Sequence, residues 1–193
     1  MERGEGPGTR PGLTPHVALL RGVNVGGNNR LPMSELARLF EAAGAERVET
    51  LIQSGNVVFE AGEAEAERIA AEVGARIAAA FRFRAPIVLR DARAWRVMLA
   101  ANPFVARGLA PAQLHVALLS ASAAPELLAR LRADRSPPDA FAATATAIYL
   151  HLPSGVGRTK LTNSWLDATL GVTSTLRNLT TATKLLQMVD ALR

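Results

Sequence analysis

The sequence contains no cysteine, so disulfide bonds, thiolate catalysis and cysteine-ligated zinc or iron-sulfur centres are excluded. It also lacks long apolar runs, since stretches such as Leu114 to Leu119 are far shorter than the roughly 20 residues that span a bilayer. We therefore expect no transmembrane segment and no membrane partner. The chain starts with MERGEGPG, which carries charge and turn residues where a signal peptide has an apolar stretch, and this favours a cytoplasmic location.

Aromatic residues and lysines are scarce as well. Aromatics make up 5% of the 193 residues, and no basic-aromatic motif for stacking nucleic-acid bases is present. Lys160 and Lys184 are the two lysines among 22 basic residues, so the net charge of +5 reflects arginine, as a compositional bias would produce. A pI near 10.9 invites a nucleic-acid interpretation, which stays open. A solvated arginine-rich surface explains the charge better.

Apolar side chains are abundant, at 49% of the residues, and suffice for a packed core. Residues 1–15 are rich in glycine, proline and arginine instead, so we expect a disordered tail there. Apolar periodicity then predicts a first half at 16–103, a turn-rich connector at 104–113 and a second half at 114–193. The first half is expected to form a strand, a helix, two strands, a helix, a strand and an added helix, at 16–21, 33–43, 47–52, 55–60, 64–80, 86–90 and 91–100.

The second half repeats this order of elements, at 114–119, 123–133, 139–143, 146–152, 160–170, 173–176 and 180–192. HVALL occurs at 16–20 and again at 115–119, and LRD at 89–91 corresponds to LRN at 176–178, each in an equivalent place. The Asp or Asn that closes each LR match offers an N-cap to the next helix. We therefore predict an α+β fold of two β-α-β-β-α-β halves of the ferredoxin-like type, each with an added helix.

A loop rich in glycine and asparagine, RGVNVGGNN at 21–29, follows the first strand. A right-handed crossover makes the first two strands of a half parallel, so this loop and the hairpin QSGN at 53–56 share one edge of the sheet. The glycines would let backbone N–H groups approach an anion that Arg21 and Asn24 orient, whereas a turn that bonds to itself is the alternative. The candidate ligand contacts in this half are Arg21, Gly22, Asn24, Gly26, Gly27, Gln53, Ser54 and Asn56.

In the second half, polar residues gather at the opposite sheet edge. SGVGRTKLTN at 154–163 leads into a helix, and an arginine and an asparagine follow the last strand. Glycine ahead of Arg, Thr and Lys at a helix N-terminus can cradle an anion, although the Walker A spacing is absent. The candidate contacts in this half are Arg158, Thr159, Lys160, Asn163, Arg177 and Asn178.

No catalytic or metal-binding pattern accompanies these loops. Ser54 has no histidine nearby in sequence to act as its base, so serine catalysis is disfavoured. His16, His115 and His151 lie in or at the ends of strands without ligand-pair spacing, and we interpret them as core or rim residues. The carboxylates form no pair typical of magnesium or glycosidase chemistry. We predict no metal site and no cofactor, and the presence of catalysis stays open.

Six segments form a specific combination: ALLRGVNVGGNN, IQSGNVVF, NPF, LHVALLS, GRTKLTN and LGVTSTLRNLTTATKLL. Together they resemble a bacterial family catalogued as domain of unknown function 1697, over about residues 16–192. The resemblance implies a two-part α+β fold and supplies no activity, so no catalytic residue is carried over. The N-terminal tail is an addition to the family pattern.

The leading hypothesis is a protein that binds a phosphate-bearing or other anionic small ligand through these loops. One alternative is a nucleic-acid-binding protein that uses an arginine-rich surface. Another is a non-catalytic interaction module whose polar loops serve structure alone. The sequence identifies neither the ligand nor the oligomeric state, and how the halves pack decides whether the two polar rims form one site.

Overall fold

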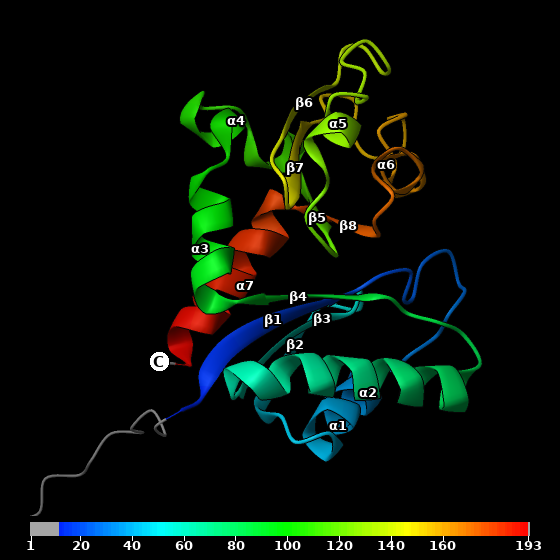
Figure 1. Ribbon diagram of the computed structural model, residues 1–193, viewed down its shortest axis with the longest axis vertical. Coiled ribbons are helices and arrows are strands. Elements are labelled where there is room, and N and C mark those ends of the chain that lie inside the picture. Colours follow the sequence, from blue (N-terminus) through cyan, green and yellow to red (C-terminus); the bar gives the residue numbers. More distant parts are fainter. Residues whose placement is uncertain (1–11, 193) are drawn as a thin grey trace, which may run out of the picture.

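The computed structural model describes residues 12–192, which form two four-stranded antiparallel sheets (Figure 1). The first sheet has the order β2-β3-β1-β4, with β1 (Thr14–Leu20), β2 (Glu46–Leu51), β3 (Asn56–Ala61) and β4 (Ile87–Asp91). The second has the order β6-β7-β5-β8, with β5 (Leu114–Leu119), β6 (Ala140–Ala143), β7 (Ala147–His151) and β8 (Ser174–Asn178). The two matching orders confirm the predicted α+β fold with two ferredoxin-like halves.

The halves also share their strand register. The histidine of each HVALL segment opens the pairing with the last strand of its half, so that His16 lies opposite Asp91 and His115 opposite Asn178. β1 and β5 are inner strands whose HVALL segments are buried throughout. A continuous apolar run is typical of a strand that is covered on both faces, which is how these two strands lie.

Two helices, α3 (Ala92–Ala100) and α7 (Leu179–Ala191), form a middle layer between the two sheets (Figure 1). Each begins at the expected N-cap, because Asp91 accepts from the Ala94 N–H at 2.7 Å and Asn178 from the Thr180 N–H at 2.8 Å. Trp95 is fully buried in this layer and donates its indole N–H to the Ala182 carbonyl at 3.1 Å. One shared apolar core therefore joins the halves.

The outer face of each sheet is covered by helices of its own half. In the first half α1 (Met33–Ala42) and α2 (Glu63–Phe81) bury side chains such as Phe40 and Ile69 against β1 and β3. In the second half α5 (Pro125–Leu128) and α6 (Asn163–Leu170) cover β5 and β7. The connector contains a short helix, α4 (Pro103–Ala106), and a 3-10 turn, η1 (Pro111–Gln113). The layers thus run helix, sheet, helix, sheet, helix.

Three expectations about element bounds differ from the structure. The helix expected at 123–133 is the single turn α5, because the polar, proline-containing segment that follows it forms turns. The helix expected from residue 160 begins at Asn163, where the Thr162 hydroxyl accepts from the Trp165 N–H at 3.2 Å and caps the helix. Thr14 and Pro15, expected in the tail, pair with β3 in the first sheet. Residues 1–11 of that tail lie outside the described residues.

The helices of the described residues include no membrane-spanning candidate, since none combines the necessary length with an apolar composition.

Candidate functional site

The end of β1 meets the β2–β3 hairpin at one edge of the first sheet. β1 and β2 both pair antiparallel with β3, so they run in the same direction, as the right-handed crossover predicts. The Leu20 N–H donates to the Gly55 carbonyl at 2.8 Å, and the Asn24 amide donates to the Gln53 carbonyl at 2.8 Å. The two glycine-bearing loops therefore form one rim.

Within this rim, the glycine and asparagine loop is held mainly by bonds to itself and its neighbours. Asn24 donates to the Leu31 and Gln53 carbonyls and accepts from the Leu31 N–H, each at 2.8 Å. Asn29 donates to the Gly22 carbonyl at 2.9 Å. These side chains hold the loop in place through hydrogen bonds. Both amide N–H groups of Asn24 are used, so none is left for a ligand. This bonding pattern resembles the alternative interpretation of the loop, a turn that bonds to itself and does not bind an anion.

Arg177 joins the second half to the rim of the first. Its Nη2 donates to the Leu20 carbonyl at 2.8 Å and to the Ser54 carbonyl at 3.1 Å, and its Nε donates to the Asn56 Oδ1. Nη1 donates within its own strand, to the Thr175 hydroxyl and the Leu176 carbonyl. All five N–H groups of the guanidinium are thus used. Its acceptors among residues 12–192 are all neutral, and burial lowers the pKa of Arg177 to about 10.

Arg90 makes the equivalent contact in the opposite direction. It stands at the same register position in β4 as Arg177 does in β8. Its Nη2 donates to the Leu119 carbonyl at 2.6 Å and to the Thr146 carbonyl at 3.2 Å, at the end of β5 and in the β6–β7 hairpin. Burial lowers its pKa as well. Each half therefore inserts one arginine into the carbonyl rim of the other.

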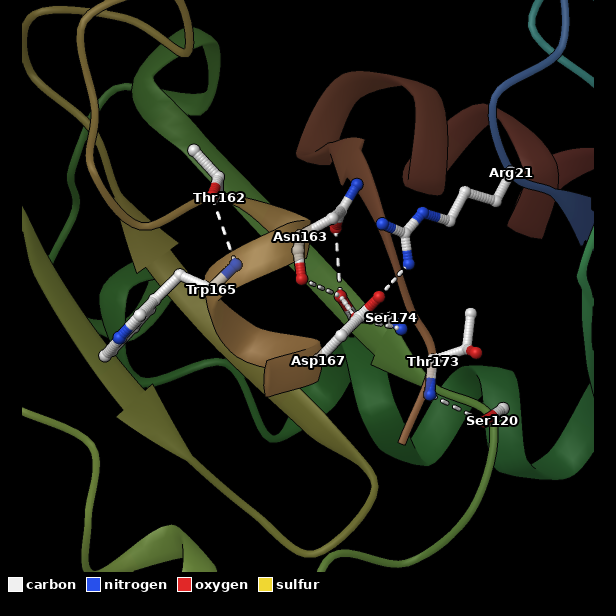
Figure 2. A network of polar contacts seen from close by, with 8 residues as sticks. All are labelled: Arg21, Ser120, Thr162, Asn163, Trp165, Asp167, Thr173 and Ser174. Atoms are coloured by element: carbon white, nitrogen blue, oxygen red, sulfur yellow. Dashed lines mark hydrogen bonds and ion pairs between the residues drawn. The ribbon is translucent and has the colours of Figure 1, made fainter. Parts of the chain in front are cut away.

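A second link across the rim is the ion pair between Arg21 and Asp167 of α6, which Figure 2 shows from close by. The Oδ1 of Asp167 accepts from the backbone N–H and the hydroxyl of Ser174, each at 2.7 Å. That hydroxyl also lies 3.1 Å from the Asn163 Oδ1 at the start of α6. The network positions Arg21 beside α6 and the beginning of β8 (Figure 2).

Between the two halves lies a pocket of about 320 Å³, which we call the inter-half pocket. The loop after β1, the hairpin, β8 and the starts of α6 and α7 all contribute to it. No Asp or Glu from the described part of the chain lines it, whereas two arginines do. Its lining consists of Leu20, Arg21, Gly22, Val23, Val25, Ser54, His115, Val156, Asn163, Thr175, Leu176, Arg177, Asn178 and Thr181.

His115 is a polar lining residue of this pocket without a hydrogen-bond partner on Nδ1. Its relative exposure is 9%, and within residues 12–192 Nδ1 is the one buried side-chain N or O atom that lacks a partner. Burial lowers the pKa of His115, and the nearby Gln113 carbonyl offsets this in part. That carbonyl already accepts from the Leu152 N–H at 2.8 Å and does not meet Nδ1 in hydrogen-bonding geometry. A buried polar atom in this state is costly, and ligand sites are among the places where it occurs.

The sequence candidates divide into three groups. Six line the inter-half pocket: Arg21, Gly22, Ser54, Asn163, Arg177 and Asn178. Three line a neighbouring pocket of about 370 Å³ beside the start of α1: Asn24, Gly27 and Gln53. The others line neither pocket: Gly26, Asn56, Arg158, Thr159 and Lys160. Asn56 is buried and fully engaged by Leu51, Ser54 and Arg177.

The segment GRTK is not at a helix N-terminus, contrary to expectation. α6 begins three residues after Lys160, whose N–H donates to the Ser136 hydroxyl at 3.0 Å and whose carbonyl accepts from Arg135. Arg158 and Lys160 are exposed. This part of the predicted anion cradle therefore lies apart from the inter-half pocket, because Thr162 rather than Lys160 starts the helix.

Sequence reasoning missed the pocket residues His115, Thr175, Thr181, Val25 and Val156. His115 carried a usable signal, because it opens the repeated HVALL segment opposite Asn178, which was a candidate. The two valines are single apolar residues inside polar loops, where the sequence gives no sign that they line a pocket. Residues 12–192 contain no group of three or more His, Asp or Glu side chains that could hold a metal ion.

Replacing Gly55 with alanine is expected to destabilise the rim. Gly55 has φ +70°, and a Cβ there would lie 2.7 Å from the Leu20 Cβ, so strain and a clash together cost about 2 kcal/mol. Gly26 is the matched control, because its φ is +58° but nothing lies within 4 Å of the added Cβ, which leaves a cost of about 1 kcal/mol. Urea unfolding of both variants measures the difference, and equal losses would contradict the close packing at Gly55.

Fold and site together define a duplicated ferredoxin-like α+β protein with a cationic pocket between its halves. The chain belongs to the family described as Protein of unknown function (DUF1697), whose model matches residues 13–149. That match includes Arg21, Gly22 and Ser54 of the pocket and ends before Asn163.

Among solved structures, the chain is similar to a conserved bacterial protein from Streptococcus pneumoniae. The two share 22% sequence identity over 92% of this chain and 99% of that one, with a TM-score of 0.67. At this identity the likeness shows the fold alone. No curated protein matches the chain.

Proposed function

We propose that this chain binds a small anionic ligand, a phosphate-bearing or carboxylate metabolite, in the inter-half pocket. The observation that carries the proposal is the charge of the lining: among the described residues Arg21 and Arg177 line the pocket, and no carboxylate does. The proposed setting is the cytoplasm, as expected from the sequence.

The two arginines have different roles in this proposal. Arg177 contributes a fixed positive charge, because its five N–H groups are already bound. Arg21 donates through Nη1 to Asp167, and a guanidinium has five N–H groups. Of the two arginines, Arg21 is therefore the one that can donate to a ligand. Asn163 begins α6 and Asn178 caps α7, so two helix N-termini add unpaired amide donors and positive dipole ends.

The pseudo-equivalent pocket of the first half differs from the inter-half pocket in charge. That pocket, of about 260 Å³, contains His16 and Arg90 in the places of His115 and Arg177. It is lined by Glu63, Glu67 and Asp91, which would repel an anion. Of these two pseudo-equivalent pockets, the inter-half pocket is therefore the one whose lining suits an anion.

Substituting Arg21 with glutamine tests the proposal. The change removes the donor and leaves Asp167 with an unpaired negative charge beside the pocket, so we expect affinity for an anion to fall roughly tenfold or more. Thermal shifts at low ionic strength, with inorganic phosphate and a panel of nucleotides, sugar phosphates and small carboxylates, identify a binder for the wild type. Calorimetric titration then compares the Kd values.

Arg158→Gln is the matched control, because it removes the same charge from an exposed position outside the pocket lining. We expect its Kd to stay within about twofold of the wild type. Absence of stabilisation of the wild type by any of these anions would overturn the proposal, and so would an equal loss of affinity in the control.

The nucleic-acid hypothesis has no comparable observation in its favour. Exposed arginines such as Arg38 and Arg68 pair with carboxylates on their own helices. A gel shift whose affinity falls steeply with salt would distinguish it from pocket binding.

A further inference from the structure

Two exposed valines, one from each half, line the inter-half pocket. Val25 has a relative exposure of 62% and Val156 of 49%, while the pocket residues Thr175 and His115 are buried. The valines therefore lie at the mouth, and the polar residues of β5 and β8 lie at the floor. The described residues include three further large apolar side chains with comparable exposure: Ile52, Val97 and Val105.

Both mouth valines are presented by glycine-bounded turns. Val25 accepts from the Asn28 N–H at 3.0 Å in a tight turn through two glycines with positive φ, and Val156 stands between Gly155 and Gly157. Turns of this kind ordinarily carry polar residues, and a valine there loses contact with the core. Single exposed valines need no explanation. Two that line the same pocket, one from each half, give its mouth an apolar part beside the charge of the arginines.

The pocket volume points to the same ligand class. About 320 Å³ lies at the low end of the range for small-molecule sites and is more than a bare inorganic anion fills. With the charged head group beside Arg21 and Arg177, the remainder of a ligand would extend between the two valines.

We infer that the ligand is a small organic anion with a short hydrocarbon portion, the phosphate or carboxylate head lying at the floor and the hydrocarbon between Val25 and Val156. This inference rests on the proposed function and names the ligand class of the same site.

A homologous series of ligands tests it. Calorimetric titration compares inorganic phosphate with methyl, butyl and hexyl phosphate, and acetate with butyrate and hexanoate, to identify the head group. We expect affinity in the preferred series to rise roughly two- to fourfold for each methylene that the mouth covers. The double variant Val25→Ser/Val156→Ser should lose the gain in affinity with chain length.

Val97→Ser/Val105→Ser is the matched control, since these valines are 61% and 48% exposed and lie outside the pocket lining. It should retain the full gain. Equal affinity of the wild type for short and long members would overturn this inference while leaving anion binding in place, and so would a gain that persists in the Val25/Val156 double variant. Absence of binding by every anion would instead overturn the proposed function together with it.

Discussion

Arg177→Met is expected to lower the free energy of unfolding by about 3 kcal/mol, because it removes five hydrogen bonds from a charged donor and leaves partly buried acceptors unpaired. The methionine side chain has a length similar to the aliphatic part of arginine. The lost stability therefore reports mainly the guanidinium contacts. Chemical denaturation followed by circular dichroism measures the change.

Arg158→Met provides the control, because Arg158 is exposed and should cost less than about 0.5 kcal/mol. Arg90→Met should cost less than Arg177→Met but more than Arg158→Met, since Arg90 makes three hydrogen bonds, two of them with the Leu119 and Thr146 carbonyls of the other half. A loss at Arg177 no larger than that at Arg158 would show that the inserted arginines do not hold the two rims together.

Trp95→Ala is expected to cost more, about 4 kcal/mol, because it opens a cavity in the layer that both sheets share. It also leaves the Ala182 carbonyl without its indole donor and so weakens the contact between α3 and α7. We expect the wild type to unfold in one transition, since the shared core makes the halves interdependent. Urea unfolding followed by circular dichroism measures both effects.

Trp165→Ala is the control for this prediction. Trp165 is only partly buried in α6, where Arg135 lies 4.7 Å from its ring centroid, so its loss should cost about 1 kcal/mol. If Trp95→Ala were no more destabilising than Trp165→Ala, the middle layer would not be the main source of cohesion between the halves.

The strand topology could be predicted from the sequence because it depends on local sequence patterns. The HVALL repeat marked the two inner strands, and the Asp and Asn after each LR match marked the following helix starts. Right-handed crossover then placed the loop 21–29 beside the hairpin 53–56, as the Asn24 to Gln53 contact shows. Each of these inferences depends on residues close together in the chain or on a rule of chain geometry.

The roles of individual site residues were less predictable. Asn24 was expected to orient a ligand, yet its amide is used by Leu31 and Gln53. Lys160 was expected at a helix start, yet Thr162 starts the helix. A side chain's hydrogen-bond partners depend on which carbonyls the fold brings near, and sequence spacing does not contain that information.

The sequence by itself determined the duplicated α+β fold, the positions of most strands and helices, and two polar rims with Arg21, Asn163 and Arg177 among their members. Only the tertiary structure decided that part of each rim meets in one pocket, that Arg177 donates all its N–H groups to oxygens of the protein itself, and that His115 and two valines also line the pocket. The physical reason is that the helices between the two sheets orient the halves through contacts between residues far apart in the chain, such as Trp95 with Ala182, and such packing leaves no periodic trace in the sequence.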